Sequence, residues 1–409
     1  MLSRLVDASM LEAEFAESTE FMGTGTRYRM LETLRAFGLD RLVAEGEDRD
    51  ADDRLLAWAV ALTAGIGATL LTEHEPEADA VLRRELANLR AAWRSARRGA
   101  DVDAAAAIVT GLYDAITYRD LLEIRGWAEE LAGDPALVGH PREAAVLGTA
   151  GEAAYHRGDH ATAERLARLG LERVTDDTTW WFCVVPLVVV ALARGEYAEV
   201  VERCLAVGER GIRVGETLGI AALACAYSGN PDRARDLQLR GSADTVSPTM
   251  QAWSDYVAGE IENLAGRPEE AQRRYRRAID LARGSGATFV VGVASVGLLT
   301  VLADAGRVTD ALRGYRDVFD YFARTGNWPH LWPALRNLAD LLRRIGDPDP
   351  AAVLDAAADQ APDAPAHNGA RPPVSSTTAP SRTDVLTVAR NAIERNVRRV
   401  ESRPASRSR

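Results

Sequence analysis

The sequence predicts an all-α fold in which pairs of helices stack into an α-solenoid. A glycine recurs at intervals of 37, 34, 37, 40 and 40 residues, a period typical of helical repeat arrays. These glycines are Gly158, Gly195, Gly229, Gly266, Gly306 and Gly346. Five positions after each stands a small apolar residue, and these are Ala163, Val200, Ala234, Ala271, Ala311 and Ala351.

Each part of the repeated phrase has a structural reason. The glycine is expected to end the first helix of a pair, where the backbone takes a left-handed conformation that glycine adopts at little cost. Asp, Asn or Pro just after it starts the second helix by capping or by fixing the first turn. The small residue lets the two helices approach closely. Apolar residues at helical spacing, such as Tyr275 and Ile279, fill the inner face.

The unit resembles the tetratricopeptide repeat family, whose repeat is a helix–turn–helix of about 34 residues. The match covers residues 141–358, and the longer intervals predict longer helices. Residues 103–133 are expected to add a helix pair that lacks the glycine. Such arrays bury a continuous core and leave a concave surface for a partner. The alternative is a plain bundle of amphipathic helices.

The beginning of the chain has a different sequence pattern from the repeats. Two extended stretches at 10–15 and 27–31 flank a polar, glycine-containing segment at 17–25, which predicts a β-hairpin. A helix is expected to follow directly, within residues 28–47. Its apolar face is predicted to carry Leu31, Leu34, Phe37, Leu42 and Val43.

The phrase YRMLETLRAFGLDRLVAEGE at 28–47 resembles a junction in large actinobacterial transcriptional regulators of the SARP and LuxR types. Segments 83–101, 326–354 and 380–396 resemble later landmarks of the same family. These regulators are signal-transduction ATPases of the STAND class. In them a nucleotide-binding domain (NB-ARC) and a winged helix precede tetratricopeptide-like repeats. The resemblance implies a sensor module linked to transcriptional regulation.

The departures from that family concern its ATPase. All 49 basic residues are arginine, so the chain contains no phosphate loop ending in GK[ST] and we expect no cofactor. Met1 falls inside the expected winged helix, which leaves only a remnant of it. By this resemblance the chain is a carboxy-terminal sensor half. A standalone product, a truncated reading frame and a split regulator all stay open.

The chain is therefore expected to have five parts. They are a winged-helix remnant with its connecting helix (1–47), a helical linker region (48–140), the tetratricopeptide-like repeats (141–358), a disordered linker (361–382) and a C-terminal helix with an Arg-rich tail (383–409). The linker is rich in Pro, Ala, Ser and Thr. The last helix carries Val385, Val388, Ala392 and Val397 near one face, and its basic end is expected to be solvated.

Composition indicates a cytoplasmic protein. The net charge of −11 argues against a protein that coats nucleic acid. Cys183, Cys204 and Cys225 are expected to be reduced and buried. The most apolar stretch, 180–193, is shorter than a membrane span and contains Pro186, so a buried helix is predicted and no membrane partner.

No constellation of residues predicts an enzyme or a metal site. Ser285 lacks the frame of a nucleophile elbow, and no cysteine has a base nearby. His156 and His160 have the spacing of metal ligands, but the turn at Gly158 separates them, so surface histidines are expected. We therefore predict no catalytic residue and no metal.

Aromatic residues in the first helices offer a candidate binding surface. Trp253, Trp328 and Trp332 lie there, and Arg336 follows Trp332 by one turn. Core filling is the alternative for these side chains. The predicted function is a non-catalytic scaffold that binds a small ligand or a protein or peptide partner, for which an ATPase or regulator subunit is a candidate. The alternative is a DNA-binding regulator that uses the wing remnant and the basic tail.

Overall fold

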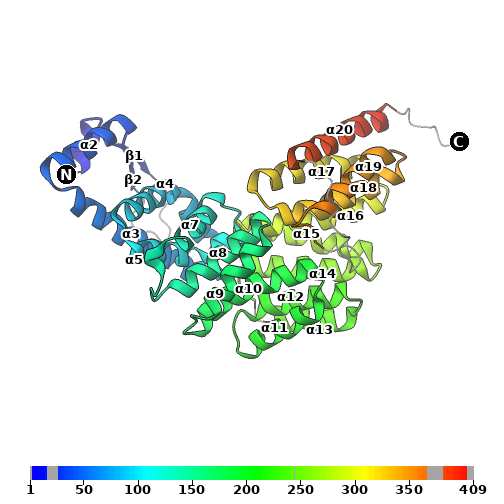
Figure 1. Cartoon of the computed structure of the whole chain (residues 1–409). Helices are drawn as coiled ribbons and strands as arrows, with labels where there is room; N and C mark the ends of the chain where they lie inside the picture. The colour runs from blue at the N-terminus through cyan, green and yellow to red at the C-terminus, as the bar shows by residue number, and fades with distance from the viewer. Residues whose placement is uncertain (1, 16–25, 244, 366–380, 403–409) are drawn as a thin grey trace.

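The computed structural model describes residues 2–15, 26–243, 245–365 and 381–402 (Figure 1). In these ranges the protein is helical except for one antiparallel hairpin, which confirms the predicted fold class. Strands β1 (Glu12–Phe15) and β2 (Thr26–Arg29) pair with Glu12 opposite Arg29. The segment expected to join them, 17–25, lies outside the described residues.

Helices before the repeats form an amino-terminal arm. They are α1 (Leu2–Asp7), α2 (Glu32–Glu45), α3 (Asp48–Thr69), α4 (Glu75–Gly99), α5 (Val102–Gly111), α6 (Tyr113–Tyr118), α7 (Leu122–Ala132) and the short 3₁₀ helix η1 (Pro135–Leu137). Helix α2 buries none of its side chains, and Phe37 and Val43 are exposed. Helices α3, α4, α5 and α7 instead share a core with α8.

Six helix pairs follow, one for each repeated glycine. They are α8 (Glu143–Arg157) with α9 (His160–Leu171), α10 (Asp177–Arg194) with α11 (Tyr197–Glu209), α12 (Val214–Tyr227) with α13 (Pro231–Ser242), α14 (Pro248–Leu264) with α15 (Pro268–Ser285), α16 (Thr288–Asp304) with α17 (Val308–Thr325), and α18 (Trp328–Arg344) with α19 (Pro348–Gln360). Successive pairs pack on one another, so the stacked array is confirmed and the plain bundle is not.

The turn chemistry is as predicted. Every repeat glycine has a positive φ, between 70° and 87°, and every small residue five positions later is fully buried. The Asp159 side chain caps α9 by accepting from the amide of Thr162. Prolines stand at the start of α13, α15 and α19. The glycine therefore ends one helix, and the cap or proline starts the next.

Helix α10 is an interior helix. Among the described residues it is the one helix long and apolar enough to cross a membrane, yet most of that stretch is buried inside the protein. Its Trp181, Cys183 and Val188 have no exposed surface. Pro186 lies within the helix and does not end it. The three cysteines are buried and free, as expected.

The array curls until its later pairs meet its beginning. Helix α15 contacts α4, α16 contacts α6, and α18 contacts α8. A first buried polar cluster stabilises the contact between the amino-terminal arm and the later helix pairs. The guanidinium of Arg119, 1% exposed, donates to Asp79 Oδ1 at 3.2 Å and to the carbonyl of Ser285 at 3.2 Å.

A second polar cluster joins α7 and α8 to the start of α18. Arg125 donates to Asn327 Oδ1 at 3.0 Å and to Asp120 Oδ1 at 3.0 Å. The same Asn327 oxygen lies 3.1 Å from His156 Nδ1. Because a buried charge without partners is costly, these bonds favour the curled arrangement over an open one.

Helix α20 (Arg382–Glu401) packs on α17, α18 and α19, at the opposite end of the molecule from α2 (Figure 1). Its predicted apolar face is confirmed by buried Val385 and Ala392. Arg399 donates to the carbonyl of Ile345 rather than pointing freely into solvent. Of the expected linker, Asp363 is buried and accepts from Arg382 at 2.8 Å, while 366–380 lie outside the described residues.

Candidate ligand-binding cavity

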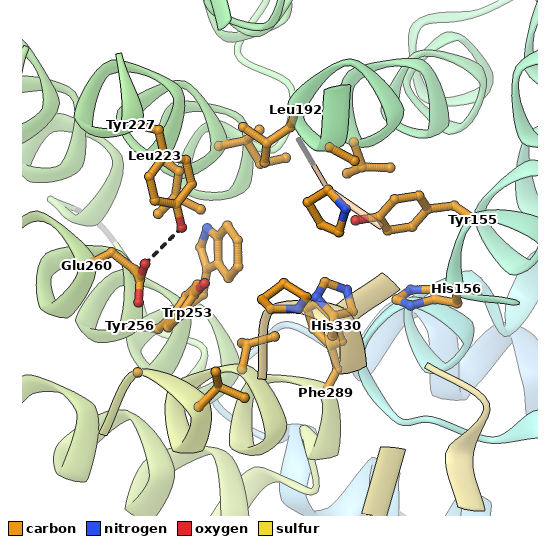
Figure 2. A pocket seen from close by; sticks show the side chains of 18 of the residues that line it. Tyr155, His156, Leu192, Leu223, Tyr227, Trp253, Tyr256, Glu260, Phe289 and His330 are labelled. Atoms are coloured by element: carbon orange, nitrogen blue, oxygen red, sulfur yellow. Dashed lines mark hydrogen bonds between the residues drawn. The ribbon is translucent and has the colours of Figure 1, made fainter. Parts of the chain in front are cut away.

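The curled array forms a partly open cavity of about 430 Å³ along its inner face (Figure 2). Its walls come mainly from α6 and from the first helix of every pair, α8, α10, α12, α14, α16 and α18, with Tyr197 of α11 and Pro365 at the edge of the lining. This volume falls within the range of about 300–1,000 Å³ found for small-molecule sites. The cavity is therefore large enough for a small organic molecule.

A repeating register puts the lining residues on the inner face. The residue six positions before the repeat glycine lines the cavity in five of the pairs, as Glu152, Val189, Leu223, Glu260 and Thr300. The residue thirteen positions before it does so in four pairs, as Glu216, Trp253, Val293 and Pro333. The two positions are seven apart, which places them on one helix face.

One aromatic cluster surrounds His330. Its imidazole lies 4.9 Å from the ring of Phe289 and 6.1 Å from the ring of Tyr155, both edge to face. His156 packs against the same Phe289 ring at 5.3 Å. Figure 2 shows these four side chains together on one side of the cavity. They come from α8, α16 and α18, so the closure assembles this cluster.

A second aromatic cluster lies on the opposite side, around Glu260 (Figure 2). The carboxylate of Glu260 accepts from the Tyr227 hydroxyl at 2.8 Å and from the Tyr275 hydroxyl at 2.7 Å. Trp253 packs against Tyr256 with ring centroids 5.5 Å apart. Gly219 makes room for this tryptophan, because a Cβ there would lie 2.3 Å from its Nε1.

Three glutamates line the cavity. Burial raises the pKa of Glu152 to about 7 and that of Glu216 to about 7, and it also raises the pKa of Glu260. Glu216 accepts from the Tyr118 hydroxyl, and Arg213 lies 3.6 Å from its second oxygen. The Oε2 atoms of Glu152 and Glu216 are both buried without a hydrogen-bond partner. Glu152 differs in that its ion-pair neighbour is the His156 imidazole rather than an arginine.

The two histidines of the cavity are neutral near pH 7. Burial lowers the pKa of His330 to about 3 and holds the pKa of His156 well below its ordinary value. The expectation that His156 and His160 lie on the surface is wrong, since they are 1% and 8% exposed. The turn at Gly158 does separate them, but α18 covers this end of the pair. No metal-binding group of acids, cysteines and histidines occurs among the described residues.

The four predicted binding residues have different surroundings. Trp253 lines the cavity. Trp332 is buried in the core, and Trp328 lies beneath the guanidinium of Arg382 at 4.5 Å. Arg336 is 8% exposed and donates to the carbonyl of Pro365 and to Asp359.

Helix α18 thus turns other residues inward, and its contributions to the cavity are His330, Pro333 and Asn337. The three glutamates were not singled out from the sequence. Their signal is the register described above, since Glu152 and Glu260 occupy the same position of their repeats. Reading the six repeats in alignment to their glycines identifies that position without a structure.

Ser285 and Cys183, two side chains that could serve as nucleophiles, are buried outside the cavity. Ser285 lies 3.0 Å from the Thr249 hydroxyl and donates to the carbonyl of Ala282. Burial raises the pKa of the Cys183 thiol to about 12, so the thiol stays protonated.

The cavity brings together three buried carboxyl groups, two aromatic clusters and two neutral histidines. Its ligand has to be inferred from this chemistry. In comparisons with known proteins, no family model matches the chain and no curated protein is significantly similar to it.

Proposed function

We propose that the chain is a non-catalytic sensor module that binds a small organic molecule in the cavity and passes the signal to a protein partner in transcriptional regulation. The observation that carries this proposal is the cavity itself. Its walls come from all six repeats and α6, so one ligand contacts helices that are far apart along the chain. Binding to such a site favours one curvature of the array over others.

The link to transcription and the cytoplasmic location rest on the resemblance and composition described above. The DNA-binding alternative has weaker support. Within helix α20, Arg395 pairs with Asp347 at 2.7 Å and Arg390 pairs with Asp320 at 2.7 Å. Because these guanidinium groups already form ion pairs within the protein, their attraction to the phosphates of DNA is weaker.

The proposal is tested by capturing a ligand from a small-molecule extract. Val189→Trp places a large ring in the cavity, and Ala198→Trp places the same ring on the exposed face of α11 as a control. Wild type and Ala198→Trp are expected to retain a compound that mass spectrometry detects after release. Val189→Trp is expected to retain none of it while keeping its helical circular dichroism. Equal retention by all three proteins would refute a ligand site in this cavity.

A further inference from the structure

The charged side chains that line the cavity are all acidic. Of the described residues that line it, three are glutamates and none is an arginine. Arg125 lies nearby, but Asp120 and Asn327 bind it. Arg213 is likewise bound by both oxygens of Asp114. An anionic ligand would therefore meet carboxyl groups without a free cation.

Glu152 and Glu216 each have a buried Oε2 without a hydrogen-bond partner, but the Arg213 guanidinium lies 3.6 Å from that of Glu216. Glu152 is therefore the glutamate that is better placed to receive a cation from the cavity. The residue is 2% exposed, its Oε1 lies 3.3 Å from His156 Nε2, and its Oε2 has no hydrogen-bond partner. His156 Nδ1 faces the oxygen of Asn327, so this nitrogen carries the imidazole proton and Nε2 presents a lone pair. Because burial raises the pKa of Glu152 to about 7, this carboxyl group holds a proton below that pH.

Aromatic rings stand beside this carboxyl group. Tyr155 and His156 lie three and four residues after Glu152 on α8, so all three share one helix face. Phe289 and His330 contact the same two rings from α16 and α18. Aromatic faces attract organic cations within about 6 Å of the ring centre.

We propose that the ligand is a small organic cation, an ammonium group on an apolar or aromatic body, whose charge pairs with Glu152. The ammonium group lies between Glu152 and the rings of Tyr155 and Phe289, and the body extends toward Trp253. This inference rests on the proposed function, because it assumes that the cavity holds a ligand. A protonated amine donates to Glu152 Oε2, whereas a quaternary ammonium pairs with it by charge alone.

Binding of such a cation releases the proton of Glu152. The ionisable groups that face Glu152 or its partner His156 come from α6, the α6–α7 loop, α7, α8, α12 and α18. They are Tyr113, Asp120, Arg125, Tyr155, Glu216 and His330. Because burial raises the pKa of Glu152 to about 7, affinity for a cation increases as pH rises from 6 to 8, by about tenfold. Glu216, whose pKa is also about 7, adds to the same trend.

The test uses calorimetry on the full chain with four probes of matched shape: phenylbutylammonium, phenylbutyltrimethylammonium, phenylbutanol and phenylbutyrate. At pH 8 both cations are expected to bind about tenfold more tightly than phenylbutanol, and phenylbutyrate is expected to bind most weakly. At pH 6 the binding heat is expected to depend on the buffer, because one proton leaves the protein. Tighter binding of phenylbutylammonium than of its trimethyl relative identifies an amine ligand, and the reverse order identifies a quaternary one.

Glu152→Gln is expected to lose the preference for cations, with its fold checked by circular dichroism. Glu129→Gln is the matched control, since Glu129 also has a pKa raised by burial but lies outside the cavity beside Arg157. If the Glu152 variant does not fold, the increase in cation affinity of the wild-type protein between pH 6 and pH 8 still tests the assignment.

Phenylbutanol binding as tightly as the cations, or phenylbutyrate binding best, would overturn the cation assignment and leave the proposed function standing. Failure of all four probes would also overturn it. The extract experiment with Val189→Trp then decides separately whether the cavity holds any ligand.

Discussion

At the scale of single residues, the cavity concentrates ionisable groups that water would normally solvate. Glu152, Glu216 and Glu260 lie on three different helices, yet each has its pKa raised by burial. Their neighbours are mainly neutral hydroxyl and imidazole groups. Such groups satisfy hydrogen bonds but do not cancel charge. The protonation of Glu152 and Glu216 therefore changes near neutral pH.

Glu152 gives a prediction for stability against pH. Its pKa is about 7 in the folded protein against 4.5 ordinarily, so the folded state holds the proton more tightly than the unfolded state. The protonated Glu152 carboxyl group makes its full contribution to the free energy of unfolding below pH 4.5. This contribution is lost as the pH rises through 7. Glu152→Gln removes that loss, so relative to wild type it gains on the order of 2–3 kcal/mol of unfolding free energy between pH 4.5 and pH 8.

The measurement is urea unfolding of both proteins across this pH range. Glu164→Gln is the control with the opposite sign, since the Arg194 guanidinium lowers the pKa of Glu164. The ion pair of Glu164 with Arg194 stabilises the folded protein above the ordinary pKa of a glutamate, and it is lost when Glu164 becomes protonated as the pH falls. A Glu152→Gln difference that stays constant with pH would show that Glu152 is not a buried, protonated group.

At the scale of elements, the six turns were predictable because their signals are local. Glycine at the end of one helix, a cap or proline at the start of the next and a small residue one turn on each act within a few positions. The inner register was present in the sequence as well, through Glu152 and Glu260. The predicted residues Trp328, Trp332 and Arg336 lie outside this register, on faces of α18 that pack on the core, on α20 and on segment 361–365.

The turn glycines give a second prediction. Gly229 has φ of 82° and no atoms near the place of a Cβ, so Gly229→Ala adds backbone strain without a clash. The expected cost is about 1–2 kcal/mol of unfolding free energy. Gly126→Ala within α7 also meets no atoms but has helical φ, so it is expected to stabilise by about 0.5–1 kcal/mol. Chemical denaturation of both variants measures the two changes in unfolding free energy. If both substitutions changed stability in the same direction, the left-handed turn assigned to Gly229 would be contradicted.

At the scale of the whole molecule, the closure of the array was not predictable from the repeats. Arg125 and Asn327 are separated by 202 positions, and Arg119 and Ser285 by 166. No local pattern marks two polar side chains as partners over such distances. The curvature that joins them depends on the sum of six helix-pair angles, which the spacing of glycines does not fix. The sequence therefore predicts a concave face but not a cavity lined by all six repeats.

The closure gives a third prediction. Asn327→Ala removes the acceptor shared by Arg125 and His156, which leaves two buried donors without a partner. The expected loss is about 2–5 kcal/mol of unfolding free energy, with faster hydrogen exchange in α8 and α18. Asn391→Ala on the exposed face of α20 is the control and is expected to change stability by less than about 0.5 kcal/mol. An Asn327→Ala protein as stable as this control would show that the polar cluster does not hold the array closed.

The central claim is that one molecule in the cavity joins all six repeats. Hydrogen–deuterium exchange of the full chain, with and without the compound captured from the extract, tests this most directly. The account predicts slower exchange on the first helices of the pairs together, α8, α10, α12, α14, α16 and α18, with little change on the exposed faces of α11 and α13. Protection confined to the second helices, to α2 or to α20 would contradict it.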